Sequence, residues 1–263
     1  MSIIEAIILG LVQGLTEFLP VSSSGHIELG KAILGTDIQE DLLFSILVHL
    51  ATVLSIFIVF RQDIWHLLKV FFRFKWTDEF KYITFILVSA IPIIIAGLFF
   101  KDFIDSLFQG NLIMVGIFLI CTGFILLLSK LEKPNSNQLT YPKAIALGIA
   151  QLIAILPGIS RSGTTIATGL ALGLSRTEAA RFSFLMVLIP IIGASAVQTL
   201  DVIETGSLAT NQILPYAAGF IAAFASGWAA CQWMLAIVKK GNITWFSVYC
   251  WIAGAVAVGV AIM

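Results

Sequence analysis

The stretch QGLTEFLPVSSSGH, residues 13–26, decides the fold of this chain. It closes an apolar segment with Leu-Pro and continues into serines and a glycine, a combination that ends a helix. A second stretch of the same plan, LPGISRSG at residues 156–163, follows another short apolar segment. Both segments are therefore predicted to be helices that break inside the apolar part of the chain.

The surroundings of these two stretches indicate an internal repeat. AIILGLVQ at residues 6–13 aligns with AIALGIAQ at residues 144–151. The two stretches are offset by 138 residues, the difference between positions 6 and 144. The same offset places Phe44, Ser45 and Leu47 on Phe182, Ser183 and Leu185. Interrupted apolar segments at matching positions of two halves are typical of a buried site built from broken helices.

The composition places this site in a membrane. Of the 263 residues, 59% are hydrophobic and 11% are charged, against about 25% charged in a soluble domain. Fifteen Lys and Arg balance fifteen Asp and Glu, so no net charge favours nucleic acid, and we expect no nucleic-acid partner. The apolar segments lie at about 3–19, 42–60, 83–100, 112–129, 144–157, 183–200, 212–238 and 244–262.

The charges between these segments predict their orientation. The connections at residues 61–81 and 130–143 are rich in Lys and Arg, so both should be cytoplasmic. The connection around Asp201 and Glu204 lacks Lys and Arg and should face outward. These assignments are consistent with one another if residues 3–35 and 144–174 are re-entrant hairpins and the other six segments cross the bilayer.

The expected fold is therefore an all-α polytopic membrane protein with two inverted-topology repeats, each a re-entrant helical hairpin plus three transmembrane helices. Repeat one covers about residues 1–130, repeat two covers about 140–263, and together they form a single integral membrane domain, residues 1–263. Because three crossings is an odd number, the hairpins enter from opposite sides, the first from outside. The alternative is eight full crossings with proline kinks.

The first hairpin carries an acidic and hydroxyl-rich group of residues. Gln13 and Glu17 are four apart and share one helix face, which leads to Ser22, Ser23, Ser24, Gly25 and His26. A carboxylate at membrane depth costs about 2.5–3.5 kcal/mol on insertion scales, so Glu17 needs a compensating role. The alternative is that Glu17 caps the broken backbone and His26 is a satisfied interior histidine.

The second hairpin carries an anion-binding group. Its polar residues precede the apolar stretch at 166–174, where a Ser is a helix N-cap signal. A helix N-terminus offers free N–H donors, and Arg161 adds a planar guanidinium that can bind a phosphate through two N–H groups. The alternative is a structural ion pair between Arg161 and Glu17. The residues of this group are Ser160, Arg161, Ser162, Gly163, Thr164 and Thr165.

Together the two groups favour phosphoryl transfer, in which catalysis is mainly positioning and charge stabilisation. The sequence contains no GxxxxGK[ST] loop, so ATP hydrolysis is not expected.

His49 is either a neighbour of the site or an interfacial residue. Arg176, Glu178 and Arg181 are predicted to begin a solvated helix. The alternative function is a transporter or flippase of an anionic lipid or solute, because broken helices also serve transport.

Gln13–His26 and PGISRSGTT at residues 157–165 resemble the two signature motifs of the bacterial undecaprenyl-diphosphate phosphatases of the bacitracin-resistance type. The resemblance covers the whole chain. It implies a hydrolase that converts undecaprenyl diphosphate to undecaprenyl phosphate and inorganic phosphate, which recycles the lipid carrier for cell-wall synthesis. Gln13 and Glu17 occupy the family's acidic motif. The segment at residues 49–52 departs from the family pattern at Ala51, which leaves the role of His49 open.

The resemblance also implies a divalent cation, Mg²⁺ or Ca²⁺, held by Glu17 and the diphosphate oxygens. We expect Ser23 to attack the terminal phosphorus while Arg161 holds the phosphoryl oxygens, with Glu17 or His26 accepting the proton. The alternative is that His26 activates water directly. The expected substrate-binding residues are Gln13, Ser22, Ser24, Gly25, Ser160, Ser162, Gly163, Thr164 and Thr165.

The expected location is the bacterial cytoplasmic membrane, with the active site toward its outer face. The expected partners are the bilayer and a polyprenyl diphosphate lipid, and a homodimer is an open alternative.

Overall fold

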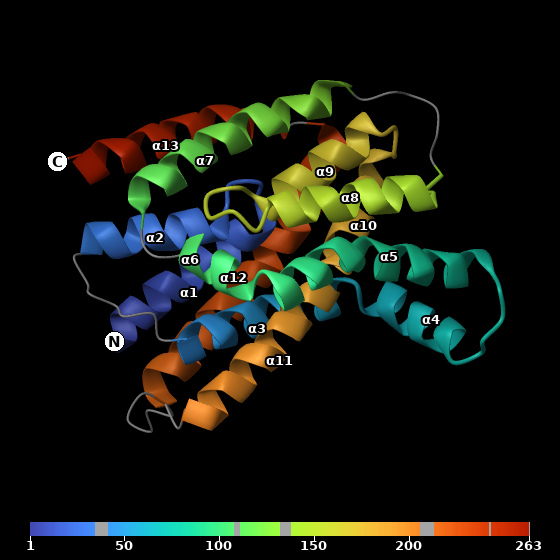
Figure 1. Ribbon diagram of the computed structural model, residues 1–263, viewed down its shortest axis with the longest axis horizontal. Helices are drawn as coiled ribbons and strands as arrows, with labels where there is room; N and C mark the ends of the chain where they lie inside the picture. The colour runs from blue at the N-terminus through green and yellow to red at the C-terminus, as the bar shows by residue number, and fades with distance from the viewer. Residues whose placement is uncertain (35–41, 108–110, 132–137, 206–212, 242, 263) are drawn as a thin grey trace.

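The chain folds into a bundle of helices, seen in a computed structural model that describes residues 1–34, 42–107, 111–131, 138–205, 213–241 and 243–262 (Figure 1). Within these ranges every regular element is helical. The elements are α1 (Ile3–Phe18), α2 (Ser23–Leu34), α3 (Leu42–Val59), α4 (Arg61–Phe71), α5 (Asp78–Phe99), α6 (Lys101–Leu107), α7 (Leu112–Leu126), the 3₁₀ helix η1 (Leu127–Leu131), α8 (Tyr141–Ile153), α9 (Arg161–Ala171), α10 (Arg176–Met186), α11 (Leu188–Thr205), α12 (Ile213–Lys240) and α13 (Trp245–Ile262).

Several helices are long and apolar enough to cross a bilayer. In the described residues these are α5, α7 with η1, α10 with α11, α12 and α13, and α3 with α4 adds a sixth if that bent pair counts as one span. The six predicted crossings correspond to these six units. The polytopic all-α fold is therefore confirmed.

Helices α3 and α4 meet at an angle of 83°, so α4 turns away from the direction of α3. On α4, the side chain of Trp65 is exposed and Lys69 lies over its ring, 5.1 Å from the centroid. Asp63 pairs with Arg181 of α10 at 2.7 Å, which fastens α4 to the bundle. The sequence predicted only a basic connection here. It also predicted a solvated Arg181, and the structure corrects this, because Arg181 is paired and lies over the Tyr82 ring.

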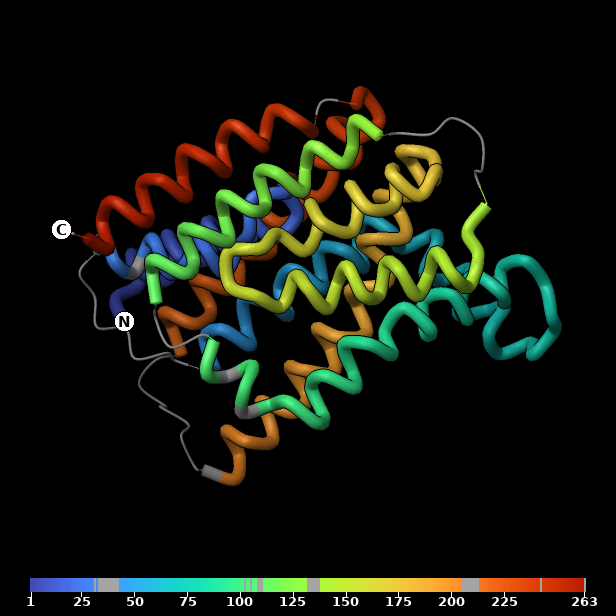
Figure 2. Tube along the Cα trace, turned by 45° about the horizontal axis from the view of Figure 1, so that its top comes forward, coloured from blue at the N-terminus to red at the C-terminus, as the bar shows by residue number. Residues whose placement is uncertain are grey.

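The two predicted breaks are present. Helix α1 ends at Phe18 and α2 begins at Ser23, while α8 ends at Ile153 and α9 begins at Arg161. Left-handed backbone marks both turns, with φ +69° at Ser22 and +103° at Gly158. Figure 2 shows α8 and α9 lying side by side as a hairpin joined by this turn.

The packing of the helices is consistent with two inverted repeats, which remain a prediction. Helix α1 packs on α12, and α8, its counterpart by sequence, packs on α5, the counterpart of α12. Helices α7 and α13, also counterparts, pack on each other. The start of α1 and the end of α13 lie at one end of the molecule, and α4 lies at the other (Figures 1 and 2). The predicted orientation requires these two ends to lie on opposite sides of the membrane, and the orientation itself remains a prediction.

Small residues bring α1 close to α12. A side chain added at Gly14 would overlap the carbonyl oxygen of Ala223 and the hydroxyl of Ser226. Close approach through glycine is the usual way in which membrane helices pack, because lipid supplies no hydrophobic drive between helices. The contact fixes the position of α1, and therefore of the acidic residue that α1 carries near its end.

Candidate active site

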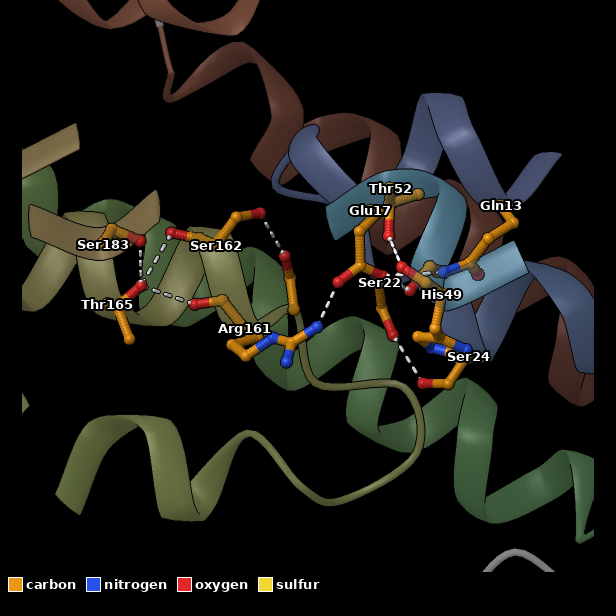
Figure 3. A network of polar contacts seen from close by, with 12 residues as sticks. Gln13, Glu17, Ser22, Ser24, His49, Thr52, Arg161, Ser162, Thr165 and Ser183 are labelled. Atoms are coloured by element: carbon orange, nitrogen blue, oxygen red, sulfur yellow. Dashed lines mark hydrogen bonds and ion pairs between the residues drawn. The ribbon is translucent and has the colours of Figure 1, made fainter. Parts of the chain in front are cut away.

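The acidic part of the site lies in the last two turns of α1. Gln13 and Glu17 share one face, as predicted, and Gln13 Nε2 donates to Glu17 Oε2 at 3.0 Å. The Glu17 side chain is only 5% exposed, so its charge is shielded from solvent. Figure 3 shows this carboxylate at the centre of a network of polar contacts.

The first hairpin turn brings a hydroxyl to the same carboxylate. Ser22 adopts its left-handed conformation, and its Oγ accepts from the N–H of Gly25 at 3.3 Å, which caps α2. Ser23, the first residue of α2, donates its hydroxyl proton to Glu17 Oε2 at 2.7 Å. Ser23 is therefore hydrogen-bonded to a buried carboxylate, an arrangement that could activate a serine hydroxyl as a nucleophile.

The second hairpin supplies the cation. Arg161 is the first residue of α9, where Ser160 caps the helix by accepting from the N–H of Gly163 at 3.1 Å. Arg161 Nη2 bonds Glu17 Oε1 across the two hairpins. Arg161 thus pairs with Glu17 and stands at a helix N-terminus, where backbone N–H groups favour an anion.

Several contacts hold the two turns together. Ser162 donates its hydroxyl proton to the Leu19 carbonyl at 3.0 Å, and the N–H of Gly158 donates to Ser24 Oγ at 3.4 Å. Thr122 of α7 donates to the Gly158 carbonyl at 2.9 Å and accepts from the N–H of Ser160 at 3.0 Å. No sequence pattern marks Thr122, because it is an isolated threonine within an apolar helix.

Glycines allow these turns to touch. A Cβ added at Gly25 would lie 3.3 Å from the Cα of Gly158, and one added at Gly163 would lie 3.0 Å from the Cβ of Pro20. Each hairpin thus places a glycine against the turn of the other. This reciprocal contact explains why small residues are needed at both positions.

Thr164 and Thr165 lie in the first turns of α9 and are both buried. Thr165 Oγ1 is 2.5 Å from Ser183 Oγ of α10 and also donates to the Arg161 carbonyl at 2.8 Å. Thr164 Oγ1 has no hydrogen-bond partner within the described part of the chain. The sequence marks Ser183 only as part of the repeat and does not predict its place beside the site.

A small cavity of about 10 Å³, room for about one water molecule, adjoins the ion pair. Its polar wall includes Glu17, Arg161, Ser162 and Ser183, and its apolar wall includes Phe18, Ile56, Phe184 and Val187. A phosphate group is larger than this space.

The two histidines lie in different surroundings, His49 as a neighbour of the site, one of its two predicted positions, and His26 away from its predicted role. His49 Nδ1 lies 2.8 Å from the Ser45 carbonyl oxygen, and its side chain lies beside Glu17 (Figure 3). His26 lies instead against Tyr249 of α13, with Nε2 2.7 Å from the tyrosine hydroxyl. The structure thus gathers Gln13, Glu17, Ser23 and Arg161 directly, and turns the imidazole of His26 away from them.

Comparison with known proteins gives a consistent match along the chain. Residues 6–256 match the family described as the bacitracin resistance protein BacA. The undecaprenyl-diphosphatase of Christiangramia forsetii is 46% identical over 98% of both chains. That of Parabacteroides distasonis is 44% identical over 100% of both chains, and that of Methanobrevibacter smithii is 39% identical over 97% of this chain and 96% of its own.

Proposed function

This chain belongs to the family of the bacitracin resistance protein BacA, and from that membership we propose how the site described above works. The protein is an undecaprenyl-diphosphatase, which hydrolyses undecaprenyl diphosphate to undecaprenyl phosphate and inorganic phosphate. One observation carries the proposal for the site: a single buried carboxylate, Glu17, bonds both the hydroxyl of Ser23 and the guanidinium of Arg161.

In the proposed first step, Ser23 Oγ attacks the terminal phosphorus and the bond from phosphorus to the bridging oxygen breaks. Undecaprenyl phosphate leaves, and the hydroxyl proton passes to Glu17, which already accepts that proton's hydrogen bond at 2.7 Å. In the second step water attacks the phosphorus of the phosphoserine and the bond from phosphorus to Ser23 Oγ breaks. Glu17 returns its proton to Ser23 Oγ, and inorganic phosphate leaves with the oxygen and protons of the water. The same contact supports Glu17 over His26 as the base, because both ring nitrogens of His26 have other partners.

Arg161 is proposed to exchange partners during binding. At rest its guanidinium neutralises Glu17, and the terminal phosphate replaces that carboxylate. A guanidinium holds two phosphoryl oxygens through parallel N–H bonds, and the N–H groups of the first turn of α9 add further donors. The exchange also frees the Glu17 carboxylate for the proton of Ser23. The resting ion pair is therefore compatible with catalysis.

The oxygen donors of this site fit a hard divalent cation, Mg²⁺ or Ca²⁺. Gln13 Oε1 is buried and has no partner within the described residues, and it belongs to the side chain that contacts Glu17. No group of three or more His, Cys, Asp or Glu side chains lies together in the described chain, so Glu17, Gln13 and the diphosphate oxygens would hold the ion. When bound, it would neutralise charge on the diphosphate.

The protein is a multi-pass membrane protein. We place it in the cytoplasmic membrane with the first hairpin, and so the active site, open toward the outer face. The support is the charge distribution: Lys and Arg gather at residues 61–81, at the end that carries α4. The end that carries the start of α1 has no comparable basic segment among the described residues.

Phosphate release from purified protein in detergent tests this function. The wild type should release phosphate from undecaprenyl diphosphate, a chelator should abolish release, and added Mg²⁺ or Ca²⁺ should restore it. Glu17→Gln should reduce kcat by about 10²–10⁴, the usual contribution of a general base. Glu5→Gln, in the exposed cap of the same helix, is the matched control and should retain activity.

Three results would contradict parts of this proposal. A wild type that binds the lipid but releases no phosphate would favour the transport alternative. A Glu17→Gln variant as active as the control would remove Glu17 as the base. Full activity in chelator would remove the cation.

A further inference from the structure

His26 makes a contact that the mechanism above does not use. Its Nε2 lies 2.7 Å from the hydroxyl of Tyr249, a residue 223 positions away on α13. The two rings are stacked, with centroids 5.6 Å apart and planes 6° from parallel. The contact joins the re-entrant hairpin to a transmembrane helix of the other half of the chain.

The partners of the imidazole determine its tautomer. Nδ1 lies 2.8 Å from the carbonyl oxygen of Ser22. A carbonyl only accepts, so Nδ1 carries the proton. In the neutral ring Nε2 is then the acceptor, and the Tyr249 hydroxyl donates to it. Neither nitrogen is left to take the proton of Ser23.

The carbonyl that His26 holds belongs to the strained turn. Ser22 has a φ of +69°, which is unfavourable for a residue with a side chain. Its carbonyl oxygen accepts from the backbone N–H of His26 at 3.2 Å as well as from the imidazole. Because Ser23 follows directly, this turn sets the direction in which the Ser23 hydroxyl points toward Glu17.

We propose that Tyr249 is a positioning residue for the phosphatase reaction: its hydroxyl donates to Nε2 and so holds the His26 ring in place, and the Nδ1–H of that ring holds the Ser22 turn and aims Ser23 at Glu17. The proposal rests on the function given above only for its effect on rate. The state of the imidazole can be measured without any substrate.

Tyr249→Phe keeps the stacked ring and removes the hydroxyl. We expect kcat to fall about three- to tenfold, the effect of one lost hydrogen bond, with KM nearly unchanged because Tyr249 does not touch the diphosphate. Tyr141→Phe is the matched control. It removes a hydroxyl that bonds Thr84 at 3.0 Å, outside the site, and should leave kcat unchanged. Wild-type kcat in Tyr249→Phe would overturn the proposal.

The tautomer gives a second readout. Nitrogen NMR of ¹⁵N-histidine-labelled protein, at mildly alkaline pH where imidazole is neutral, should show His26 as the Nδ1–H form in the wild type. The His26 signal is identified by its loss in His26→Asn. In Tyr249→Phe, Nδ1 should stay protonated and the Nε2 signal should shift, because Nε2 loses its hydrogen-bond donor. An Nε2–H form in the wild type, or no change in the variant, would overturn the proposal even if the protein is a phosphatase.

Two amide replacements separate positioning from base catalysis. The short amide of His26→Asn places its N–H₂ near the position of Nδ1, so it should still bond the Ser22 carbonyl and retain more activity than His26→Gln. Adding Tyr249→Phe to His26→Asn should cause no further loss, because the partner of the hydroxyl is gone. Equal, complete loss in both amide variants, or an additive effect of Tyr249→Phe, would overturn the proposal.

Discussion

At the scale of single residues, the site depends on one carboxylate with several partners. Glu17 accepts from Gln13 and Ser23 on one oxygen and from Arg161 on the other. An isolated carboxylate would be expensive at this depth, and these contacts satisfy it. A buried charge that loses its partner destabilises a protein far more than an exposed one. Substitutions at either end of the ion pair therefore need controls for folding.

The role of Ser23 is tested by trapping. With substrate carrying a radiolabelled terminal phosphate, wild-type protein quenched in acid should retain label covalently, and Ser23→Ala should retain none. Ser24→Ala, which removes the neighbouring hydroxyl, is the control and should still be labelled. Label retained on Ser23→Ala would show that another group is the nucleophile. Turnover by wild type without any retained label would favour direct attack by water.

The role of Arg161 is tested by removing its guanidinium or replacing it with an ammonium group. Arg161→Ala should lower kcat/KM by more than about tenfold, the loss expected from a charged hydrogen bond. Arg161→Lys should recover only part of this, because an ammonium lacks the planar pair of donors. The exposed Arg73 supplies the control, and Arg73→Lys should leave kcat/KM unchanged. Full activity of Arg161→Lys would count against bidentate holding of the phosphate.

At the scale of elements, each turn is tied to a transmembrane helix of the α7–α13 pair. Thr122 of α7 bonds the second turn, and Cys250 of α13 lies 3.5 Å from the Pro20 carbonyl of the first. Without the hydroxyl of Thr122, the buried N–H of Ser160 would have no acceptor. Such a group costs about 1–3 kcal/mol. The α7–α13 pair therefore supports both broken hairpins.

Thr122→Val, which keeps the shape and removes the hydroxyl, tests this support. It should lower the free energy of unfolding by about 1–3 kcal/mol and reduce kcat, because Arg161 follows the released turn directly. Thermal unfolding and phosphate release measure the two effects. Thr122→Ser keeps the hydroxyl and should stay close to wild type. A Val variant as stable and active as the Ser variant would show that the bridge has no role.

The elements also show what the sequence could predict. Proline, serine and glycine mark both breaks, and the pairing of Glu17 with Arg161 was considered from their chemistry alone. Both predictions follow from residue types and their spacing within short stretches of the chain. Contacts of Thr122 and Tyr249 join residues far apart in the chain with no pattern to mark them. The direction of the His26 imidazole likewise depends on α13, so it could be found only once the helices were packed. Helix α4 was missed because its charges indicated a connection rather than a helix.

At the scale of the whole molecule, the hairpins meet because two halves of the chain pack around them. The largest buried apolar cluster contains Phe18 of α1, Ile166 of α9 and Met234 of α12. Side chains that face outward are also apolar, for example Ile4 and Leu98, with 70% and 74% exposure. An apolar outer surface of this kind is suited to lipid. The polar site is thus enclosed by apolar packing that both halves share.

The accessibility of single cysteines tests the orientation of the protein in the membrane. In a variant with Cys121, Cys231 and Cys250 replaced by alanine and activity retained, single cysteines are placed at Ser106 on α6 and at Thr77 before α5. Both positions are exposed. In intact cells an impermeant thiol reagent should label Ser106→Cys and not Thr77→Cys, and both should react after lysis. The reverse pattern would place the active site on the cytoplasmic side.

The distance in sequence between the members of the ion pair has a consequence for how the protein is made. Arg161 follows Glu17 by 144 residues. At about 5–20 residues per second of synthesis, the acid leaves the ribosome roughly 7–30 seconds before its cation. During that delay the newly inserted first hairpin must keep its carboxyl protonated or held at the water interface. The polar contacts of the first half are therefore completed only when the second half has been made.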